Sequence, residues 1–210
     1  MLSILIAAGW PVVPLLLCSV IALALIIERH LSLRESRVAP PKLLEEVMSV
    51  TRSSLPNADT VAKLSENSVL GQLLAQGIRA AQSEPRIQEV ALRGAFEGAG
   101  REAIHRLERN LNALGTIASA APLLGLLGTV IGMIEIFAAS GGGTGGNPAE
   151  LAHGISVALY NTAFGLIVAI PSLIAYRHFR TRIEEHVLTL EQAADRMVPH
   201  ILRLGHGRRG

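Results

Sequence analysis

The sequence is poor in cysteine and in charge, and both shortages restrict what the chain can be. Cys18 is the single cysteine among 210 residues, which excludes an intrachain disulfide and gives no basis for redox chemistry. Only 17% of the residues are charged and 3% are aromatic, whereas half are hydrophobic. The sequence has no nucleophile–base set and no metal-ligand spacing, and its seven histidines are scattered. It therefore predicts neither an enzyme nor a bound cofactor or metal, and no nucleic-acid partner.

Three long runs of the sequence are almost free of charged residues. They cover residues 4–27, 113–139 and 154–176, and Glu135 is the one charged residue inside them. A bilayer core about 30 Å thick needs about 20 apolar residues in helix, so each run is long enough to cross it. We expect an all-α integral membrane protein with three transmembrane helices, the first of them within 1–27.

The first apolar run is expected to stay in the membrane rather than to be removed. A cleavable signal peptide begins with basic residues and has an apolar core of about 7–15 residues. Here no Lys or Arg precedes the run, which is longer than that and ends at the charged stretch ERHLSLRESR (28–37). We therefore interpret this boundary as a stop-transfer signal.

The basic residues define an orientation. All 19 Lys and Arg residues fall between Arg29 and Arg109 or after Tyr176. Basic segments close to membrane helices stay in the cytoplasm. The expected segments are an outer amino terminus, a periplasmic glycine-rich loop at 140–153, a cytoplasmic region at 28–112, and a cytoplasmic helix and tail at 177–210. The arginines expected to anchor the third span at the headgroups are Arg177, Arg180 and Arg182.

Both cytoplasmic segments are expected to be helical. One helix is predicted in 40–54, and another begins at a cap formed by Asn57 or Asp59. A third begins near Pro85 and continues without a break into the second span. The helix that follows the third span is expected to kink or end at Pro199.

Small residues recur at intervals of three and four in the second and third runs. That spacing places them on one face of each helix, where two backbones can approach closely. In the second span the series continues onto Glu135, which we expect to face a neighbouring helix rather than lipid. The packing stripe comprises Ala121, Gly125, Gly128 and Gly132 in the second span, and Ala158, Gly165 and Ala169 in the third.

Polar residues lie at two depths in these spans. Thr129 and Thr162 are each about ten residues from the outer loop, so at about 1.5 Å per residue they should lie level, near mid-membrane, with Asn161 beside them. Glu135 and Val157 are each about four residues in. An ionisable group in a membrane is costly and suggests function. Nearness to the outer surface eases its hydration, however, and a membrane threonine often bonds only its own backbone. Functional and purely structural interpretations therefore both stay open.

Two stretches resemble the ExbB, TolQ and MotA proton-channel family: APLLGLLGTVIGM (121–133) and GISVALYNTAFGLIVAIP (154–171). Three spans with a large cytoplasmic region resemble the ExbB and TolQ branch. The resemblance implies a ring, pentamer-like, around two copies of a single-span partner, ExbD or TolR, whose membrane Asp carries the proton. It also implies that Thr129 and Thr162 line the pore beside that Asp. Many relatives have a Glu where this chain has Val157, and we hypothesise that Glu135 supplies the acid instead.

The resemblance implies a subunit of the bacterial inner membrane that, with an ExbD-like partner, converts the proton motive force into work for a TonB-like protein and for TonB-dependent transport. Two alternatives remain open: a TolQ-like subunit of the Tol-Pal system, and a non-conducting scaffold. In the scaffold, Glu135, Asn161 and Thr162 only hold helices together. The stretch GGGTGG (141–146) lacks the Lys-Ser/Thr ending of a phosphate loop and is expected to be a flexible connection.

Overall fold

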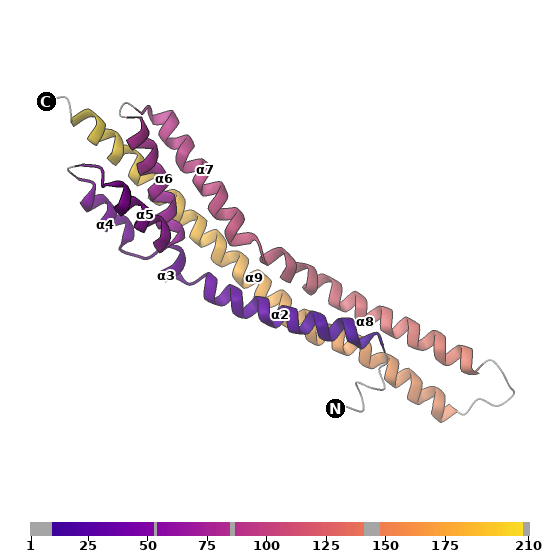
Figure 1. Ribbon diagram of the computed structural model, residues 1–210. Helices are drawn as coiled ribbons and strands as arrows, with labels where there is room; N and C mark the ends of the chain where they lie inside the picture. Colours follow the sequence, from indigo (N-terminus) through magenta and orange to yellow (C-terminus); the bar gives the residue numbers. More distant parts are fainter. Residues whose placement is uncertain (1–9, 53, 85–86, 141–147, 208–210) are drawn as a thin grey trace. The chain divides into compact units, whose positions relative to one another are not determined.

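The computed structural model describes residues 10–52, 54–84, 87–140 and 148–207, and these residues fold into helices joined by short turns, with no strand (Figure 1). The all-α prediction is therefore confirmed. Three helical stretches are long and apolar enough to cross a membrane: Val12–Ser32, part of Glu89–Ala138, and part of Gly154–Leu204. The helices are α2 (Val12–Ser32), α3 (Glu35–Val38), α4 (Leu43–Val50), α5 (Ala58–Asn67), α6 (Val69–Ser83), α7 (Glu89–Glu108), α8 (Leu111–Ser140) and α9 (Pro148–Gly207).

The contacts divide the chain into two units. The first, called here the membrane unit, contains residues up to Arg29 and from Asn110 to His178. The second unit contains the segment from His30 to Arg109 and the segment that begins at Phe179. Because α9 is a single helix of 60 residues, it contributes to both units.

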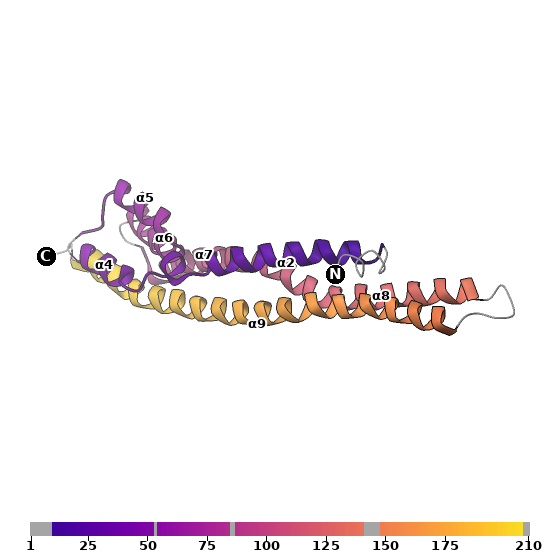
Figure 2. The same cartoon turned by 90° about the horizontal axis from the view of Figure 1, so that it is seen from below.

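In the membrane unit, α2 packs against α8 and α9, and Figure 2 shows α8 and α9 side by side. Leu15 of α2 is buried in a cluster with Ala121 and Ala169. Near the other end of α2, Asn110 Nδ2 donates a hydrogen bond to Glu28 Oε2 at 3.1 Å. These two contacts show that α2 and α8 run antiparallel.

The second unit has its own apolar core. Leu74 and Ile78 of α6 pack with Leu92 of α7 and Met197 of α9, and all four are fully buried. Local capping sets where the surrounding helices begin, since Asn57 Oδ1 accepts the Thr60 N–H at 2.9 Å. The predicted cap at Asn57 is confirmed, and it stabilises the first turn of α5.

One predicted helix is interrupted. Arg109 and Asn110 form a turn that separates α7 from α8, so the expected continuous helix into the second span is wrong. At this turn the side chain of Asn110 donates a hydrogen bond to Glu28, so the interruption coincides with a contact to α2. Residues 85–86 lie outside the described residues.

The other differences concern helix ends. α9 passes through Pro199 and continues to Gly207, so the helix does not end at this proline. α2 runs to Ser32, five residues beyond the predicted boundary, because a helix does not have to end where the apolar run ends. Likewise, α9 already begins at Pro148, within the segment predicted as a loop. The stretch 141–146 lies outside the described residues.

Candidate functional site

The backbones of α8 and α9 are in close contact at two glycines. A Cβ atom on Gly125 would lie 2.7 Å from the carbonyl oxygen of Asn161, and one on Gly165 would lie 2.6 Å from that of Ala121. Such distances are too short for any real side chain, so the packing at these positions requires glycine. Close approach of this kind allows interhelical hydrogen bonds to form between short side chains.

The glycine contacts also define the register of the two antiparallel helices. Gly125 faces Gly165, and a Cβ on Gly132 would lie 3.1 Å from the Cβ of Ala158. Each step along α8 is therefore matched by an equal step in the opposite direction along α9. This register places Thr129 and Thr162 level with each other.

Thr129 and Thr162 form a hydroxyl pair across the two helices. Their Oγ1 atoms are 2.5 Å apart, and both side chains are half-buried. The Thr129 hydroxyl also lies 3.2 Å from the carbonyl oxygens of Gly125 and Ala158. The Thr162 hydroxyl lies 3.4 Å from the Gly125 carbonyl oxygen. Thr129 thus bonds across the helix interface as well as to its own helix.

The hydroxyl pair has more acceptor sites than protons. Each hydroxyl carries one proton and two lone pairs, and the backbone carbonyls only accept. If Thr129 donates to Thr162, then Thr162 donates to the Gly125 carbonyl oxygen; if Thr162 donates to Thr129, the Thr129 proton goes to Gly125 or Ala158. In both arrangements oxygen lone pairs remain available. A half-buried group of this kind can bind a protonated carboxyl or a water molecule from outside the chain.

Asn161 occupies the opposite side of the same contact. It is 2% exposed, and a Cβ on Gly128 would lie 2.9 Å from its Cβ and Cγ atoms. Pro11, directly before α2, lies beside Gly128 as well, at 3.0 Å from such a Cβ. Asn161 therefore lies where α2 begins, whereas the threonine pair lies on the side of α8 that is turned away from α2.

Glu135 differs from its prediction, because its side chain is exposed and does not pack between α8 and α9. The stripe ends near Gly132, which is already half-exposed. On an ideal helix Glu135 lies on the same side as Gly128, toward α2. However, α2 begins at Val12, near the level of Gly128, so no described residue of α2 reaches Glu135. The register of α8 against α9 places Val157 within about 3 Å of Glu135, measured along the helix axis.

The charged residues next to the membrane unit form ion pairs. Arg180 pairs with Glu184 at 3.2 Å and Arg182 pairs with Glu185 at 3.4 Å, and the side chains of Arg177, Arg180 and Arg182 are all exposed. These ion pairs lie within α9 and do not test contact with lipid headgroups. The role of the three arginines as membrane anchors therefore stays a prediction.

Sequence reasoning missed one buried charge. Arg29 is 3% exposed and bonds Glu28 through two nitrogens at 2.6 Å, and Glu28 in turn accepts from Asn110. The signal available in the sequence was an acid–base pair directly after an apolar run.

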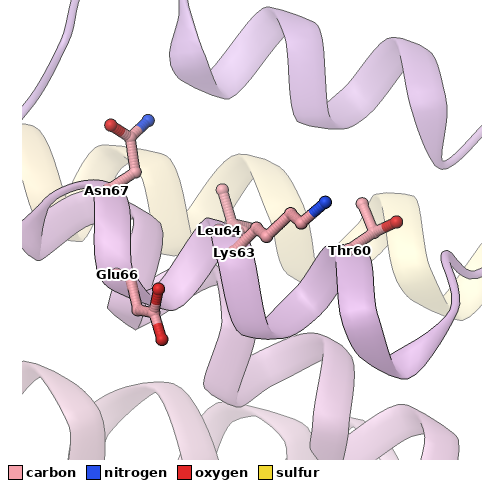
Figure 3. A pocket seen from close by; sticks show the side chains of 5 residues that line it. All are labelled: Thr60, Lys63, Leu64, Glu66 and Asn67. Atoms are coloured by element: carbon pink, nitrogen blue, oxygen red, sulfur yellow. The ribbon is translucent and has the colours of Figure 1, made fainter.

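A shallow depression lies on α5 in the second unit (Figure 3). Its lining comes from this one helix, and Figure 3 shows the Lys63 and Glu66 side chains pointing apart. It therefore presents no convergent set of polar groups. The lining residues are Thr60, Lys63, Leu64, Glu66 and Asn67.

Part of the membrane unit and part of the second unit match a known family. Residues 65–192 match the model of the MotA/TolQ/ExbB proton channel family. The chain belongs to this family. Within it the chain is ExbB-like, and it is a membrane protein built on apolar helices.

Curated relatives cover most of this MotA/TolQ/ExbB family member. The chain is 34% identical over 179 residues to biopolymer transport protein ExbB-like 3 of Synechocystis, covering 83% of this chain and 82% of the relative. It is 31% identical over 162 residues to biopolymer transport protein exbB1 of Vibrio cholerae, covering 76% and 70%. It is also 35% identical over 108 residues to the Tol-Pal system protein TolQ of Haemophilus influenzae, covering 50% and 47%.

Proposed function

We propose that this ExbB-like protein is the ring-forming subunit of a proton-driven motor in the bacterial inner membrane. The observation that carries the proposal is the hydroxyl pair of Thr129 and Thr162, which joins two glycine-lined helices within the apolar part of a proton-channel family member. The amino terminus would be periplasmic and the carboxyl terminus cytoplasmic, because the basic residues cluster on one side. We expect five copies, in keeping with the resemblance described above.

The partner would be a single-span protein of the ExbD or TolR type with an Asp in its membrane helix. The half-buried hydroxyl pair could accept a hydrogen bond from that Asp when the Asp is protonated. When the Asp is ionised, Thr162 could donate to it by turning its proton away from the Gly125 carbonyl oxygen, 3.4 Å away. Each proton transfer would change the preferred contact between partner and ring, and the resulting movement would be passed to a TonB-like protein for transport across the outer membrane.

The test is to remove one hydroxyl without changing the volume of the side chain. In a complex with its single-span partner, Thr129→Val should reduce proton flux into vesicles at least tenfold, because the pair loses the proton-exchanging oxygen. Thr129→Ser retains the hydroxyl and should retain most of the flux. Both variants must form a complex of native size; wild-type flux in an assembled Thr129→Val complex would refute the proposal.

A TolQ role in the Tol-Pal system is the second candidate, supported by the similarity to the Haemophilus influenzae protein. Deleting the gene distinguishes the two. Loss of TonB-dependent uptake with an intact envelope supports the ExbB role, and detergent sensitivity with normal uptake supports the TolQ role. A scaffold without conduction would show wild-type uptake in every threonine and Glu135 variant.

A further inference from the structure

The exposed surface of α8 is apolar over one half of the helix and small or polar over the other. Its large exposed apolar side chains begin at Leu123 and continue to Phe137. In the half of α8 that lies next to Asn110, the exposed positions are instead occupied by small or polar residues, namely Asn112, Ala113, Thr116 and Ser119. Asn112, Thr116 and Ser119 follow one another at intervals of four and three, so they share one face of the helix. We call these three residues the polar face of α8.

The other two membrane helices are mostly apolar at the same level, although α2 also exposes Ser19 there. A Cβ on Gly115 would lie 2.9 Å from the ring of Tyr176, so this part of α9 is level with the polar face. Here α9 exposes Leu173 and Ile174, the latter 65% exposed, and α2 exposes Val20 and Leu23. The exposed side chains of α2 and α9 at this level are therefore mostly apolar, with Ser19 the exception, whereas those of α8 are small or polar.

The polar face extends into the apolar run 113–139, which contains Thr116 and Ser119. Ser119 is about 13 Å along the helix from Asn110, where the polar residues begin. The hydroxyls of Thr116 and Ser119 donate to the carbonyl oxygens of Asn112 and Gly115, at 2.9 and 3.0 Å. These bonds use the protons and leave the oxygen lone pairs available as acceptors for water.

A proton at the threonine pair has no internal route past the glycine contact. Directly beyond the pair, the backbones meet at Gly125 and Gly165, and the next stripe residue, Ala121, is 0% exposed. A Cβ does not fit between these backbones, so a water molecule does not fit either. A route from the pair toward Asn110 therefore runs outside this interface, where the polar face of α8 offers hydroxyl and amide groups.

Pro122 supplies a polar group between the threonine pair and the polar face. This proline lies inside α8 and has no N–H, so the carbonyl oxygen of Ala118 cannot receive its usual helical hydrogen bond. Pro122 is half-buried on the same side of α8 as Thr129. The Ala118 carbonyl oxygen thus lies on the way from Thr129 to Ser119, which are about 15 Å apart.

We propose that the polar face of α8 lines a water-filled passage that carries protons between the threonine pair and the cytoplasm. The proposal rests on the proposed proton-channel function and extends it from the threonine pair to the cytoplasmic half of the path. The passage is closed on its other sides by neighbouring copies or by the partner helix.

Accessibility to a charged thiol reagent tests the passage without relying on transport. The native thiol is first removed by Cys18→Ala. Cysteines are then introduced as Thr116→Cys, Ser119→Cys and, as a lipid-facing control at the same level, Ile174→Cys. The full complex is treated in inside-out vesicles with a positively charged methanethiosulfonate, which requires water to reach a thiolate.

We expect Thr116→Cys and Ser119→Cys to react at least ten times faster than Ile174→Cys, and their modification to reduce proton flux. Equal reaction rates at the three positions, whether fast or slow, would overturn the proposal. Such a result with wild-type flux would refute the passage and leave the channel function intact. Fast, selective labelling in a complex that conducts no protons would support the passage and refute the channel function.

Discussion

At the scale of single residues, the structure places the threonine pair and Glu135 in different environments, although the sequence predicts that all three face a helix interface. Thr129 and Thr162 are joined by a hydrogen bond across α8 and α9, at the common depth that counting from the outer loop predicts. Glu135 is only six residues from Thr129, yet it is exposed and lies on the side of α8 that faces α2. The threonines belong to the helix interface, and the acid belongs to the exposed surface of α8.

Glu135 is expected to supply protons to the path from the outer side. Glu135→Gln keeps the size and removes the exchangeable charge, so proton flux should fall several-fold while the complex still assembles. Glu135→Asp should retain part of the flux. Unchanged flux in an assembled Glu135→Gln complex would leave the acid with a structural role only.

His200 is expected to make the second unit sensitive to acid. Thr51 is fully buried and donates its hydroxyl to the Val47 carbonyl at 2.7 Å, so it accepts from His200 Nε2 at 2.8 Å. Burial lowers the pKa of His200, nearby Arg203 and Arg52 lower it further, and a hydrogen bond to the backbone of Thr51 acts in the opposite direction.

Because the pKa of His200 is lower in the folded chain, the unfolded chain binds more protons as the pH falls below about 6.5. Stability from this group is therefore complete above that pH and decreases on acidification. The unfolding midpoint of the wild type should fall more between pH 7.5 and 5.5 than that of His200→Gln, which keeps an N–H donor. Parallel pH profiles would contradict this expectation.

At the scale of elements, glycine has opposite consequences in two helices. In α8 and α9 glycine permits backbone contact. In α7, by contrast, a Cβ added to Gly94 would have no neighbouring atom within 4 Å. Gly165→Ala should destabilise the protein by about 1–3 kcal/mol, because the backbone of α8 must move away. Gly94→Ala should be neutral or stabilise by up to about 1 kcal/mol through helix propensity. Thermal unfolding measures both, and a similar loss in the two variants would contradict the assignment of the contact.

Helix boundaries show what a local pattern can and cannot predict. The apolar runs located all three candidate membrane helices, because hydropathy adds up residue by residue. The turn at Arg109 and Asn110 was missed, since the side chain of Asn110 bonds Glu28, a residue far away in the sequence. The ends of α2 and α9 were misplaced for a simpler reason: hydropathy locates the edge of the membrane, not the end of a helix.

At the scale of the whole molecule, α9 links the two units because it supplies residues to both cores. Met197, Val198 and Ile201 are buried in the second unit with Leu74 and Ile78 of α6. A chain that ends after His178 keeps its three apolar stretches but loses these core residues. Limited proteolysis should then cut readily within 30–109, whereas a chain that ends after Leu204 should resist like the wild type. Equal resistance of both truncations would show that the second unit does not depend on α9.

The sequence alone determined that the chain is helical, that three stretches can cross a membrane, and that small residues line one face of the second and third of them. These are local properties, set by the hydropathy and spacing of neighbouring residues. Only the tertiary structure decided that Thr129 contacts Thr162, that Glu135 is exposed, and that the part of α8 before Leu123 turns a polar face outward. Those outcomes depend on the register of α8 against α9 and on the level at which α2 begins, and contacts between distant segments fix both.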